Sequence, residues 1–376
     1  MTRLIDIRSL LDRRRAGVGQ YAYRLTMALL DRPPVPGRQY RLFAPGWKGV
    51  LPGDLPEGNG RIGYCRPKIP NRILNAAVSL SGRPRLEDLA GNFDVAWLPN
   101  INFSATGRPY AVTVHDLSFI RFPEFFPAKM RLWHAMASPA RLFRQAARVI
   151  AVSRHTKEDL IETYGIGEER IEIVSPAVGP EFRPAKPEER AAVREKYGLP
   201  ERFFLFLGTI EPRKNIDGLI EAFGRLKTDS HLVIAGGRGW LWQKTLRQAA
   251  ISPARDRIHF IDYVDEADKP ALYSSAVALT YPSFYEGFGM PPLEAMACGC
   301  PVIASFASSL GEVVGEAGLL IDPHDLNELT EAMRLVLEET GLSERLSDSG
   351  IVAAKRFDWG TGAERIDSIL NDICER

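Results

Sequence analysis

The stretch YPSFYEGFGMPPLEAMACGCPVIAS (281–305) carries the strongest structural signal in the sequence. An apolar segment runs into a loop that holds Glu286 and two glycines, and two prolines then open a helix. Proline suits the first turn of a helix, where the backbone N–H has no intrahelical partner. Glycine lets the backbone approach a ligand closely, and a helix N-terminus offers free N–H groups and a positive dipole end. The stretch therefore predicts a phosphate-binding turn between a strand and a helix.

Two carboxylates lie eight residues apart in this stretch, Glu286 in the loop and Glu294 about one turn into the helix. A carboxylate accepts hydrogen bonds from two hydroxyls, so such a pair could hold diols on either side of a phosphate, one on a sugar and one on a ribose. The structural alternative makes Glu294 a carboxylate that favours the helix dipole and Glu286 a surface residue of the loop. Spacing alone leaves both interpretations open.

Short apolar runs alternate with helical patterns along the whole chain, which predicts an α/β protein with parallel sheets. In the first half, we expect strands at Thr2–Ile7, Tyr40–Ala44, Asp94–Leu98, Tyr110–Val114, Arg148–Val152 and Ile171–Ser175, and helices at Val18–Leu30, Ala128–Ala147 and Thr156–Tyr164. Residues 45–91 are rich in Gly, Pro and Arg, and predict mobile loops around a short helix.

The second half is more regular. We expect strands at 203–208, 231–236, 257–264, 277–283, 301–305 and 318–322, and helices at 216–226, 241–250, 269–275, 292–298 and 326–339. Strands about 20–30 residues apart are typical of βα units, which form parallel sheets. Ligands of such sheets bind beyond the carboxyl ends of the strands.

Four prolines between residues 176 and 187 give this segment the composition of a linker. We therefore expect one domain at 1–176 and a second at 177–355. A C-terminal helix at 356–376 is expected to pack back on the first domain. Two such domains predict a ligand-binding cleft that faces the carboxyl ends of both sheets.

The charge of the chain is asymmetric. Its 376 residues are 45% hydrophobic and 25% charged, as in ordinary globular proteins, and the formal net charge is +1. Residues 1–175 nevertheless carry +10 and the remainder −9. A basic half predicts an anionic partner, such as a membrane surface, a lipid phosphate or a nucleic acid. The alternative is that an interface between the halves absorbs the charge. The basic residues near candidate acceptor loops are Arg13, Arg14, Arg15, Arg66, Lys68, Arg72, Arg83 and Arg85.

The sequence carries no sign of export. Basic residues follow the apolar ones at the N-terminus, the reverse of a signal peptide, and no apolar run approaches the roughly 20 residues that span a bilayer. The four cysteines show neither zinc-ligand nor C-x-x-C spacing. We expect a cytoplasmic protein with reduced cysteines, held reversibly at the inner membrane leaflet by its basic half.

Three further pairs of residues lie where strands are predicted to end. Gly17 and Gly19 precede the first long helix, Arg213 and Lys214 follow the strand at 203–208, and His115 and Asp116 follow the strand at 110–114. Adjacent cations could neutralise a diphosphate. The structural alternatives are a tight turn for the glycines, a surface pair shielded by Glu211 for the cations, and a structural histidine.

The 281–305 stretch resembles the Glu-x7-Glu motif of the retaining GT-B enzymes of glycosyltransferase family 4. Further segments resemble the family in the expected order and extend the resemblance over the chain: DIRSLLDRRRAGVGQYAYRL (6–25), VTVHDL (112–117), RVIAVSRHTKEDL (148–160) and FLGTIEPRKNIDGLIEAF (206–223). The resemblance implies a GT-B fold, in which two Rossmann-like domains with parallel sheets face each other across a cleft. It further implies transfer with retention from a nucleotide diphosphate sugar to a glycan or lipid-linked glycan.

The resemblance also implies roles for individual residues. It assigns catalysis to His115, Arg213, Lys214 and Glu286, and substrate binding to Gly17, Gly19, Asp116, Gly287, Phe288, Gly289, Met290 and Glu294. Thr209 stands where the family often has an additional arginine, so we expect Arg213 to take part of that task. The resemblance implies no enzymic general base. The wording YEGFGMPPLEAMACG resembles mannosyltransferases of bacterial polysaccharide assembly, which makes GDP-mannose the first candidate donor, followed by UDP- and dTDP-sugars.

The absence of several known motifs excludes some classes of enzyme. The sequence has no Asp-x-Asp, the usual metal–diphosphate clamp of the other glycosyltransferase architecture, and no P-loop or G-x-G-x-x-G fingerprint. We expect no metal ion, no cofactor and no nucleic acid partner. The alternatives are a GT-B sugar-nucleotide epimerase or phosphorylase, a non-catalytic GT-B scaffold that partners an active enzyme, and a periplasmic sugar-binding protein.

Overall fold

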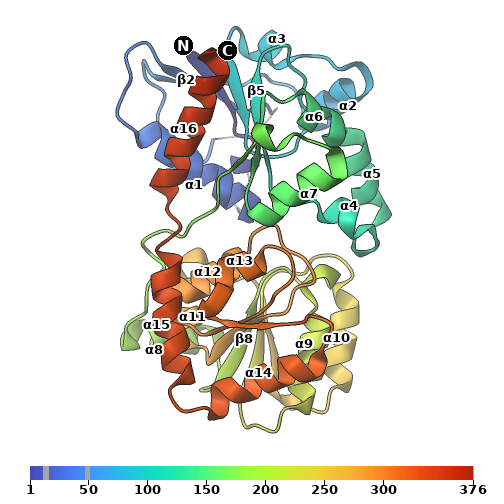
Figure 1. Ribbon diagram of the computed structural model, residues 1–376, viewed down its shortest axis with the longest axis vertical. Coiled ribbons are helices and arrows are strands. Elements are labelled where there is room, and N and C mark those ends of the chain that lie inside the picture. Colours follow the sequence, from blue (N-terminus) through green and yellow to red (C-terminus); the bar gives the residue numbers. More distant parts are fainter. Residues whose placement is uncertain (12–16, 47–50, 376) are drawn as a thin grey trace. The chain divides into compact units, whose positions relative to one another are not determined.

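The computed structural model describes residues 1–11, 17–46 and 51–375. Internal contacts divide the chain into two compact units (Figure 1). Unit 1 comprises Met1–Phe119, Ala128–Pro176 and Trp359–Arg376, and unit 2 comprises Ile120–Pro127 and Ala177–Asp358. We expected a boundary near residue 177, where the long segment of unit 2 begins. The assignment of Ile120–Pro127 to unit 2 has no counterpart in the sequence analysis.

Unit 1 is built on a seven-stranded parallel sheet in the order β3-β2-β1-β4-β5-β6-β7. Its strands are β1 (Thr2–Asp6), β2 (Gln39–Phe43), β3 (Ile62–Cys65), β4 (Val95–Leu98), β5 (Tyr110–Val114), β6 (Arg148–Ala151) and β7 (Ile171–Ile173). Every residue of β4, β5 and β6 is buried. Such continuous burial is typical of parallel strands that are covered on both faces.

The helices of unit 1 are α1 (Gly17–Asp31), α2 (Asn71–Ser81), α3 (Leu86–Ala90), α5 (Ala128–Ala137), α6 (Pro139–Gln145), α7 (Arg154–Tyr164) and α16 (Trp359–Glu375). Helix α4 (Ser118–Arg121) begins in unit 1 and ends in unit 2. Residues 45–91 thus hold more regular structure than we expected, because β3, α2 and α3 all lie there. The single helix expected at 128–147 is broken. Ser138 has a φ of 50°, and Pro139, which begins α6, has no N–H to continue α5.

Unit 2 is built on a six-stranded parallel sheet in the order β10-β9-β8-β11-β12-β13. Its strands are β8 (Phe203–Leu207), β9 (His231–Ala235), β10 (Ile258–Ile261), β11 (Ala278–Tyr281), β12 (Val302–Ser305) and β13 (Leu319–Ile321). Its helices are α8 (Pro187–Tyr197), α9 (Ile216–Arg225), α10 (Trp242–Ile251), α11 (Lys269–Ser275), α12 (Met290–Ala297), α13 (Leu310–Val314), α14 (Leu326–Glu338) and α15 (Leu342–Ala354). Helix α8 begins inside the proline-rich segment that resembled a linker.

Both sheets follow the Rossmann strand order, with the strand direction in sequence reversing between β1 and β4 in unit 1 and between β8 and β11 in unit 2. The predicted α/β class with two Rossmann-like domains is therefore confirmed. In such sheets, ligands bind at the carboxyl ends of the strands on either side of the reversal. The topology thus selects the loops after β8 and β11 as the first place to look for a site.

Segment Ile120–Pro127 is attached to unit 2 by aromatic side chains. The Phe126 ring stacks on Trp240 with centroids 5.5 Å apart, and the Phe125 ring stacks on Phe284 at 5.7 Å. The Trp240 indole N–H also donates a hydrogen bond to the Phe125 carbonyl. Aromatic pairs of this kind contribute about 0.5–1.5 kcal/mol beyond their buried area. The chain therefore leaves unit 1, contributes one short segment to unit 2, and returns.

Helix α16 packs on α1 and completes unit 1 (Figure 1). Arg3, on β1, is fully buried, and its guanidinium reaches the Asp367 carboxylate of α16 at 2.5 Å. Arg38 approaches the same carboxylate oxygen at 2.8 Å, and Arg3 also donates to the Asn371 side chain at 2.6 Å. Helix α16, near the end of the chain, thus neutralises the buried Arg3 of the first strand. None of the described helices has the length and apolar composition needed to cross a bilayer.

We predict that Asp367→Ala destabilises unit 1 by about 3–5 kcal/mol, because it leaves the Arg3 guanidinium buried without a counter-ion. Burial opposes ionisation of Asp367, but Arg3 and Arg38 outweigh it and lower its pKa. The stabilisation is therefore present above about pH 4, the ordinary Asp value, and is lost as pH falls below it. Urea denaturation measures both effects. Asp372→Ala, an exposed change on the same helix, is the control and should leave stability nearly unaltered.

Candidate active site

Two loops meet at the strand-order reversal of unit 2. Strands β8 and β11 are paired in the sheet, so the loops that follow them start side by side. The first loop leads into the 3-10 turn Pro212–Lys214, and the second contains Glu286. The carbonyl of Arg213 accepts a hydrogen bond from the backbone N–H of Phe284 at 2.9 Å, and this bond ties the loops together. The sheet thus brings together the two cations and the glutamate that the sequence analysis singled out.

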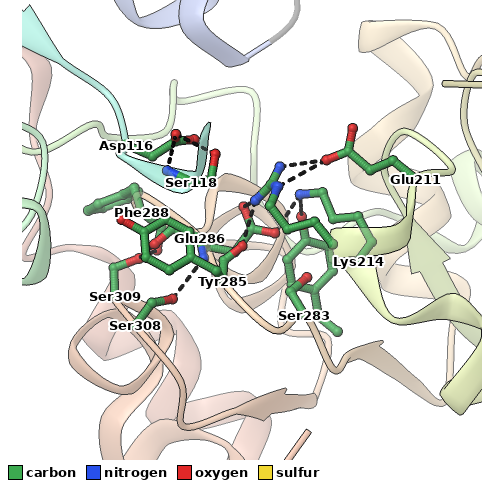
Figure 2. Close-up of polar contacts among 12 residues, drawn as sticks. Asp116, Ser118, Glu211, Lys214, Ser283, Tyr285, Glu286, Phe288, Ser308 and Ser309 are labelled. Atoms are coloured by element: carbon green, nitrogen blue, oxygen red, sulfur yellow. Dashed lines mark hydrogen bonds and ion pairs between the residues drawn. The ribbon is translucent and has the colours of Figure 1, made fainter. Parts of the chain in front are cut away.

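Glu286 forms ion pairs with both cations. Its Oε1 accepts a hydrogen bond from Lys214 Nζ at 2.5 Å, and its Oε2 lies 2.9 Å from an Arg213 guanidinium nitrogen (Figure 2). Glu286 is 7% exposed and Lys214 is 8% exposed. The structural alternatives, a surface loop glutamate and a surface pair of cations, are therefore wrong for the positions of these side chains.

Glu211 is the fourth charge of the cluster. Its Oε1 accepts hydrogen bonds from Arg213 Nε at 3.1 Å and from a terminal guanidinium nitrogen at 2.7 Å. Another nitrogen of Arg213 donates to the Tyr285 carbonyl at 2.6 Å. The guanidinium of Arg213 therefore contacts Glu211, Glu286 and a backbone carbonyl. These contacts join the two loops, and the two cations and two carboxylates balance in charge.

Lys214 is oriented differently. Its ammonium donates to Glu286 and to the Tyr281 hydroxyl, each at 2.5 Å. An ammonium has three N–H donors, so these described partners leave one donor for a ligand. Tyr281 ends β11, and its buried hydroxyl fixes the direction of the ammonium. Sequence analysis missed Tyr281 because a tyrosine at the end of a strand is typical of the core.

Two serines that follow β12 shape the loop around Glu286. The backbone N–H of Glu286 donates to Ser308 Oγ at 2.7 Å (Figure 2). Ser309 Oγ donates to the carbonyls of Glu286 at 2.9 Å and of Phe288 at 2.8 Å. The loop backbone is therefore held from a third strand. Neither serine was predicted, since isolated serines carry no recognisable spacing.

The charges around Glu286 determine its ionisation. Burial alone would raise its pKa, but Arg213 and Lys214 outweigh burial and lower the pKa to about 2. Burial raises the pKa of Glu211, and Arg213 opposes it only in part. Glu286 is thus a carboxylate over the whole physiological pH range. It can accept hydrogen bonds from a ligand hydroxyl with the lone pairs that the cations leave.

Glu294 lies in a separate buried environment on α12. Its carboxylate is 7% exposed and accepts a hydrogen bond from the Tyr273 hydroxyl of α11 at 2.7 Å, with Lys269 Nζ at 4.0 Å. Burial raises the pKa of Glu294, and Lys269 opposes the rise. Glu286 and Glu294 are therefore not a pair: each has its own cation, and each could hold a different part of one ligand.

Gly289 sets the start of α12. Its φ is 113°, and a Cβ at this position would lie 2.6 Å from a Leu310 methyl group. Only glycine fits this conformation and space. Helix α12 begins directly afterwards at Met290, which is half-buried. Gly287 and Phe288 are buried, and the Phe288 ring packs edge-on against Phe357, so the backbone of Phe288 is the part suited to ligand contact.

In unit 1, His115 follows β5 and is fixed by a backbone carbonyl. Its Nε2 lies 2.8 Å from the Pro99 carbonyl, and its ring packs edge-on against Tyr21. Burial lowers the pKa of His115, while the Pro99 carbonyl partly opposes this. A neutral ring that donates from Nε2 carries its acceptor lone pair on Nδ1. His115 is thus arranged to accept a hydrogen bond, as from a sugar hydroxyl.

The other residues of unit 1 that were predicted to bind substrate are Asp116, Gly17 and Gly19. Asp116 Oδ1 accepts hydrogen bonds from the Ser118 N–H at 3.0 Å and its hydroxyl at 2.6 Å, and so caps the start of α4 (Figure 2). Helix α1 starts at the exposed Gly17, and Gly19 is buried in its first turn. Residues 12–16, which precede them in the sequence, lie outside the described residues. Within the described chain, no group of three or more His, Cys, Asp or Glu residues could hold a metal ion.

We predict that Glu286 stabilises the fold with a specific pH dependence. Its pKa of about 2 lies below the unfolded value of about 4.3, which corresponds to about 3 kcal/mol. This contribution is complete above about pH 5 and is lost as pH falls towards 2. The difference in unfolding free energy between wild type and Glu286→Gln should therefore shrink between pH 6 and pH 3 in urea denaturation. Glu188→Gln, at an exposed position, should show no such trend.

Two family models match the chain. Residues 189–372 match the model described as glycosyl transferases group 1, and residues 15–182 match the model described as Glycosyltransferase Family 4. The two matches together include every residue predicted from the sequence to act in the site. They also fall on different units for most of their length.

Individual proteins are similar as well. The chain is 36% identical over 256 residues to the O-antigen chain mannosyltransferase B of Escherichia coli, a match that covers 66% of each chain. It is 32% identical over 229 residues to the serotype-specific mannosyltransferase WbdA of Escherichia coli, with 59% of this chain and 28% of that one covered. The chain thus spans less than two thirds of the length of these relatives. In fold, it matches HepE of Anabaena, solved in complex with UDP-glucose, with a TM-score of 0.75, 19% identity and coverage of 99% and 100%.

Proposed function

This chain belongs to glycosyltransferase family 4, and we propose that it transfers a hexose from a nucleotide diphosphate sugar to a glycan. The observation that carries the proposal is the buried ion-pair cluster of unit 2, Glu211, Arg213, Lys214 and Glu286, at the strand-order reversal. It places a cation with an open N–H donor and an ionised carboxylate in adjoining loops. That combination suits a ligand that carries both phosphate charge and sugar hydroxyls.

The donor we propose is GDP-mannose, with UDP- and dTDP-sugars as the next candidates. Similarity to two mannosyltransferases of Escherichia coli supports mannose as the sugar. Nothing in the described residues identifies the base, so GDP is proposed as the usual carrier of mannose. HepE, whose fold is similar, is described with UDP-glucose, which supports the donor class and not the base.

We assign the parts of the donor to the residues of unit 2 as follows. The open N–H of Lys214 and the free N–H groups at the start of α12 face the diphosphate. Glu286 accepts hydrogen bonds from hydroxyls of the transferred sugar. Glu294, in its own environment with Tyr273 and Lys269, accepts from the ribose hydroxyls. Residues Gly287–Met290 supply backbone contacts.

The proposed reaction proceeds with retention. The bond from the anomeric carbon to the diphosphate oxygen breaks, and the electron pair leaves with the diphosphate, where Lys214 and α12 stabilise the new charge. The acceptor hydroxyl attacks on the face from which the diphosphate departs, and a diphosphate oxygen takes its proton. Neutral His115 accepts a hydrogen bond from a sugar hydroxyl through Nδ1. Catalysis then rests on positioning and charge stabilisation, with no protein nucleophile, general base or metal ion required of this chain.

We further propose that the acceptor is a lipid-linked glycan and that the enzyme acts in the cytoplasm at the inner membrane leaflet. The +10 charge of residues 1–175 supports attraction to anionic lipid. Of the basic residues named in the sequence analysis, Arg13, Arg14 and Arg15 lie outside the described residues, and the other five are exposed. Nucleic acid is not part of the proposal.

Turnover with different donors tests the proposal. We predict that wild type consumes GDP-mannose faster than UDP- or dTDP-sugars, and that Lys214→Ala lowers turnover at saturating donor by about 10²–10³. The loss corresponds to about 3 kcal/mol of leaving-group stabilisation. Release of nucleoside diphosphate and mass analysis of the glycan provide the measurement. The product also separates transfer from epimerisation, which would leave the glycan unchanged.

Lys227→Ala is the matched control, because it removes the same charge from an exposed position of unit 2. It should retain wild-type turnover. Near-normal turnover of Lys214→Ala would refute the assignment of Lys214 to the leaving group, and absence of transfer from every donor would refute the proposed activity.

Calorimetry separates the roles of the two glutamates. We predict that Glu294→Ala weakens binding of both GDP and GDP-mannose by about tenfold or more, because both ligands carry the ribose. Glu286→Ala should weaken GDP-mannose more than GDP, since GDP lacks the sugar hydroxyls that would donate to Glu286. Equal losses for both ligands in both variants would contradict this division. Glu188→Ala serves as the exposed control.

A further inference from the structure

Unit 1 contains a cavity of about 610 Å³ that is separate from the candidate active site. Among the residues that line it are Tyr110 and Ala147, at the amino ends of β5 and β6. His115, by contrast, follows the carboxyl end of β5. Neither His115 nor Asp116 is among the described residues that line the cavity, although Leu98, the last residue of β4, is. The volume lies in the range of small-ligand pockets.

Four arginines line this cavity: Arg83, Arg85, Arg108 and Arg141. No aspartate or glutamate is among the described residues that line it. Arg85 lies near Glu87, whose two oxygens already accept from Thr106 Oγ1 at 2.8 Å and the Gly107 N–H at 2.7 Å. The Glu87 carboxylate thus forms hydrogen bonds with the loop before β5.

The other three arginines have no counter-ion among the residues that the structure describes. Within the part of the chain that the structure describes, no carboxylate pairs with the side chain of Arg83, Arg108 or Arg141. Arg3 and Arg8 of the same unit are both paired with aspartates. Several guanidiniums without partners around one cavity favour a polyvalent anion, and the planar fork of arginine suits phosphate oxygens.

Exposed apolar side chains flank the cavity. On α2, Ile73 is 61% exposed and Leu80 is 86% exposed, and seven residues apart they share one face of the helix. On α5, Leu132 and Met136 are also exposed and lie one turn apart. Met136 and residues next to Leu80 line the cavity itself.

Helices α2 and α5 adjoin each other at this place. Ser79 Oγ donates a hydrogen bond to the Met136 carbonyl at 3.3 Å, and Figure 1 shows α2, α5 and α6 on the same side of unit 1. Apolar side chains beside a cluster of arginines are typical of surfaces that lie at the boundary between lipid headgroups and acyl chains. A soluble phosphate ligand would account for the arginines and leave the apolar residues unexplained.

We propose that this cavity binds the phosphate headgroup of an anionic phospholipid, while the exposed apolar residues of α2 and α5 enter the acyl boundary. The inference rests on the membrane association included in the proposed function and gives it a defined site. It also relocates two residues of the sequence analysis. Arg83 and Arg85 were expected near the acceptor side, and they line this cavity together with residues of α2, α5 and α6.

Vesicle flotation of the full chain tests the proposal, with phosphatidylcholine alone and with added phosphatidylglycerol. We expect binding only to the vesicles with phosphatidylglycerol. The variant Arg83→Gln/Arg141→Gln should lose about thirtyfold in affinity, because each basic residue at an anionic surface contributes about 1 kcal/mol. The control Arg66→Gln/Lys68→Gln removes the same charge from exposed positions that lie outside α2 and do not line the cavity, and should lose less than about threefold. Equal losses in the two variants would overturn the cavity in favour of diffuse attraction.

Two further measurements distinguish lipid from soluble phosphate. Leu80→Ser/Leu132→Ser should reduce vesicle binding and leave calorimetric binding of glycerol phosphate unchanged. If glycerol phosphate binds in an Arg83-dependent way but no vesicle is bound, the ligand is a soluble phosphate and the lipid proposal is wrong. Transfer to a soluble glycan acceptor is followed in parallel. The cavity variants should retain it, so that loss of lipid binding and failure of the proposed activity are separate results.

Discussion

The carboxylate of Glu286 is the point on which the site in unit 2 depends. It neutralises Lys214 and Arg213, which come from the loop after β8, although it belongs to the loop after β11. Without it, two buried cations would repel each other across a turn of the backbone. With it, the loops are joined and the ammonium of Lys214 is directed by Tyr281. A buried ion pair is costly to form, and here its geometry serves to fix an arrangement that hydrophobic packing alone could not specify.

The paired strands explain why distant parts of the sequence can meet in this way. In a parallel sheet with this strand order, β8 and β11 are neighbours although two βα units separate them in the chain. Each loop therefore needs only a few correctly placed side chains, and the sheet supplies the rest of the geometry. Ser308 and Ser309 extend the same principle to the loop after β12.

The sequence allowed the α/β class and the course of most strands to be predicted, because each depends on local patterns. The family resemblance assigned Lys214 and Glu286 to one site but did not predict the ion pair between them. It did not allow Tyr281 to be placed in the cluster, because that contact depends on which strands are neighbours, and no period in the sequence encodes it. Glu211, two residues before Arg213, was expected only as the shield of a surface pair. Strand β3 was missed because its flanks are rich in glycine and proline, and the break at Ser138 was missed because the helical pattern continues through it. The roles of the site residues remain predictions.

The path of the chain has a consequence for how this protein can be divided. The backbone passes from one unit to the other at four places, after Phe119, Pro127, Pro176 and Asp358. No single cut therefore yields either unit as one continuous fragment. A fragment that ends at Pro176 would lack α16 and leave the Arg3 guanidinium without Asp367. Exchange of donor-binding units between related chains would have to keep Trp359–Arg376 with the first unit and carry the Ile120–Pro127 segment with the second. The two units of this protein are thus defined by their internal contacts and not by continuous stretches of sequence.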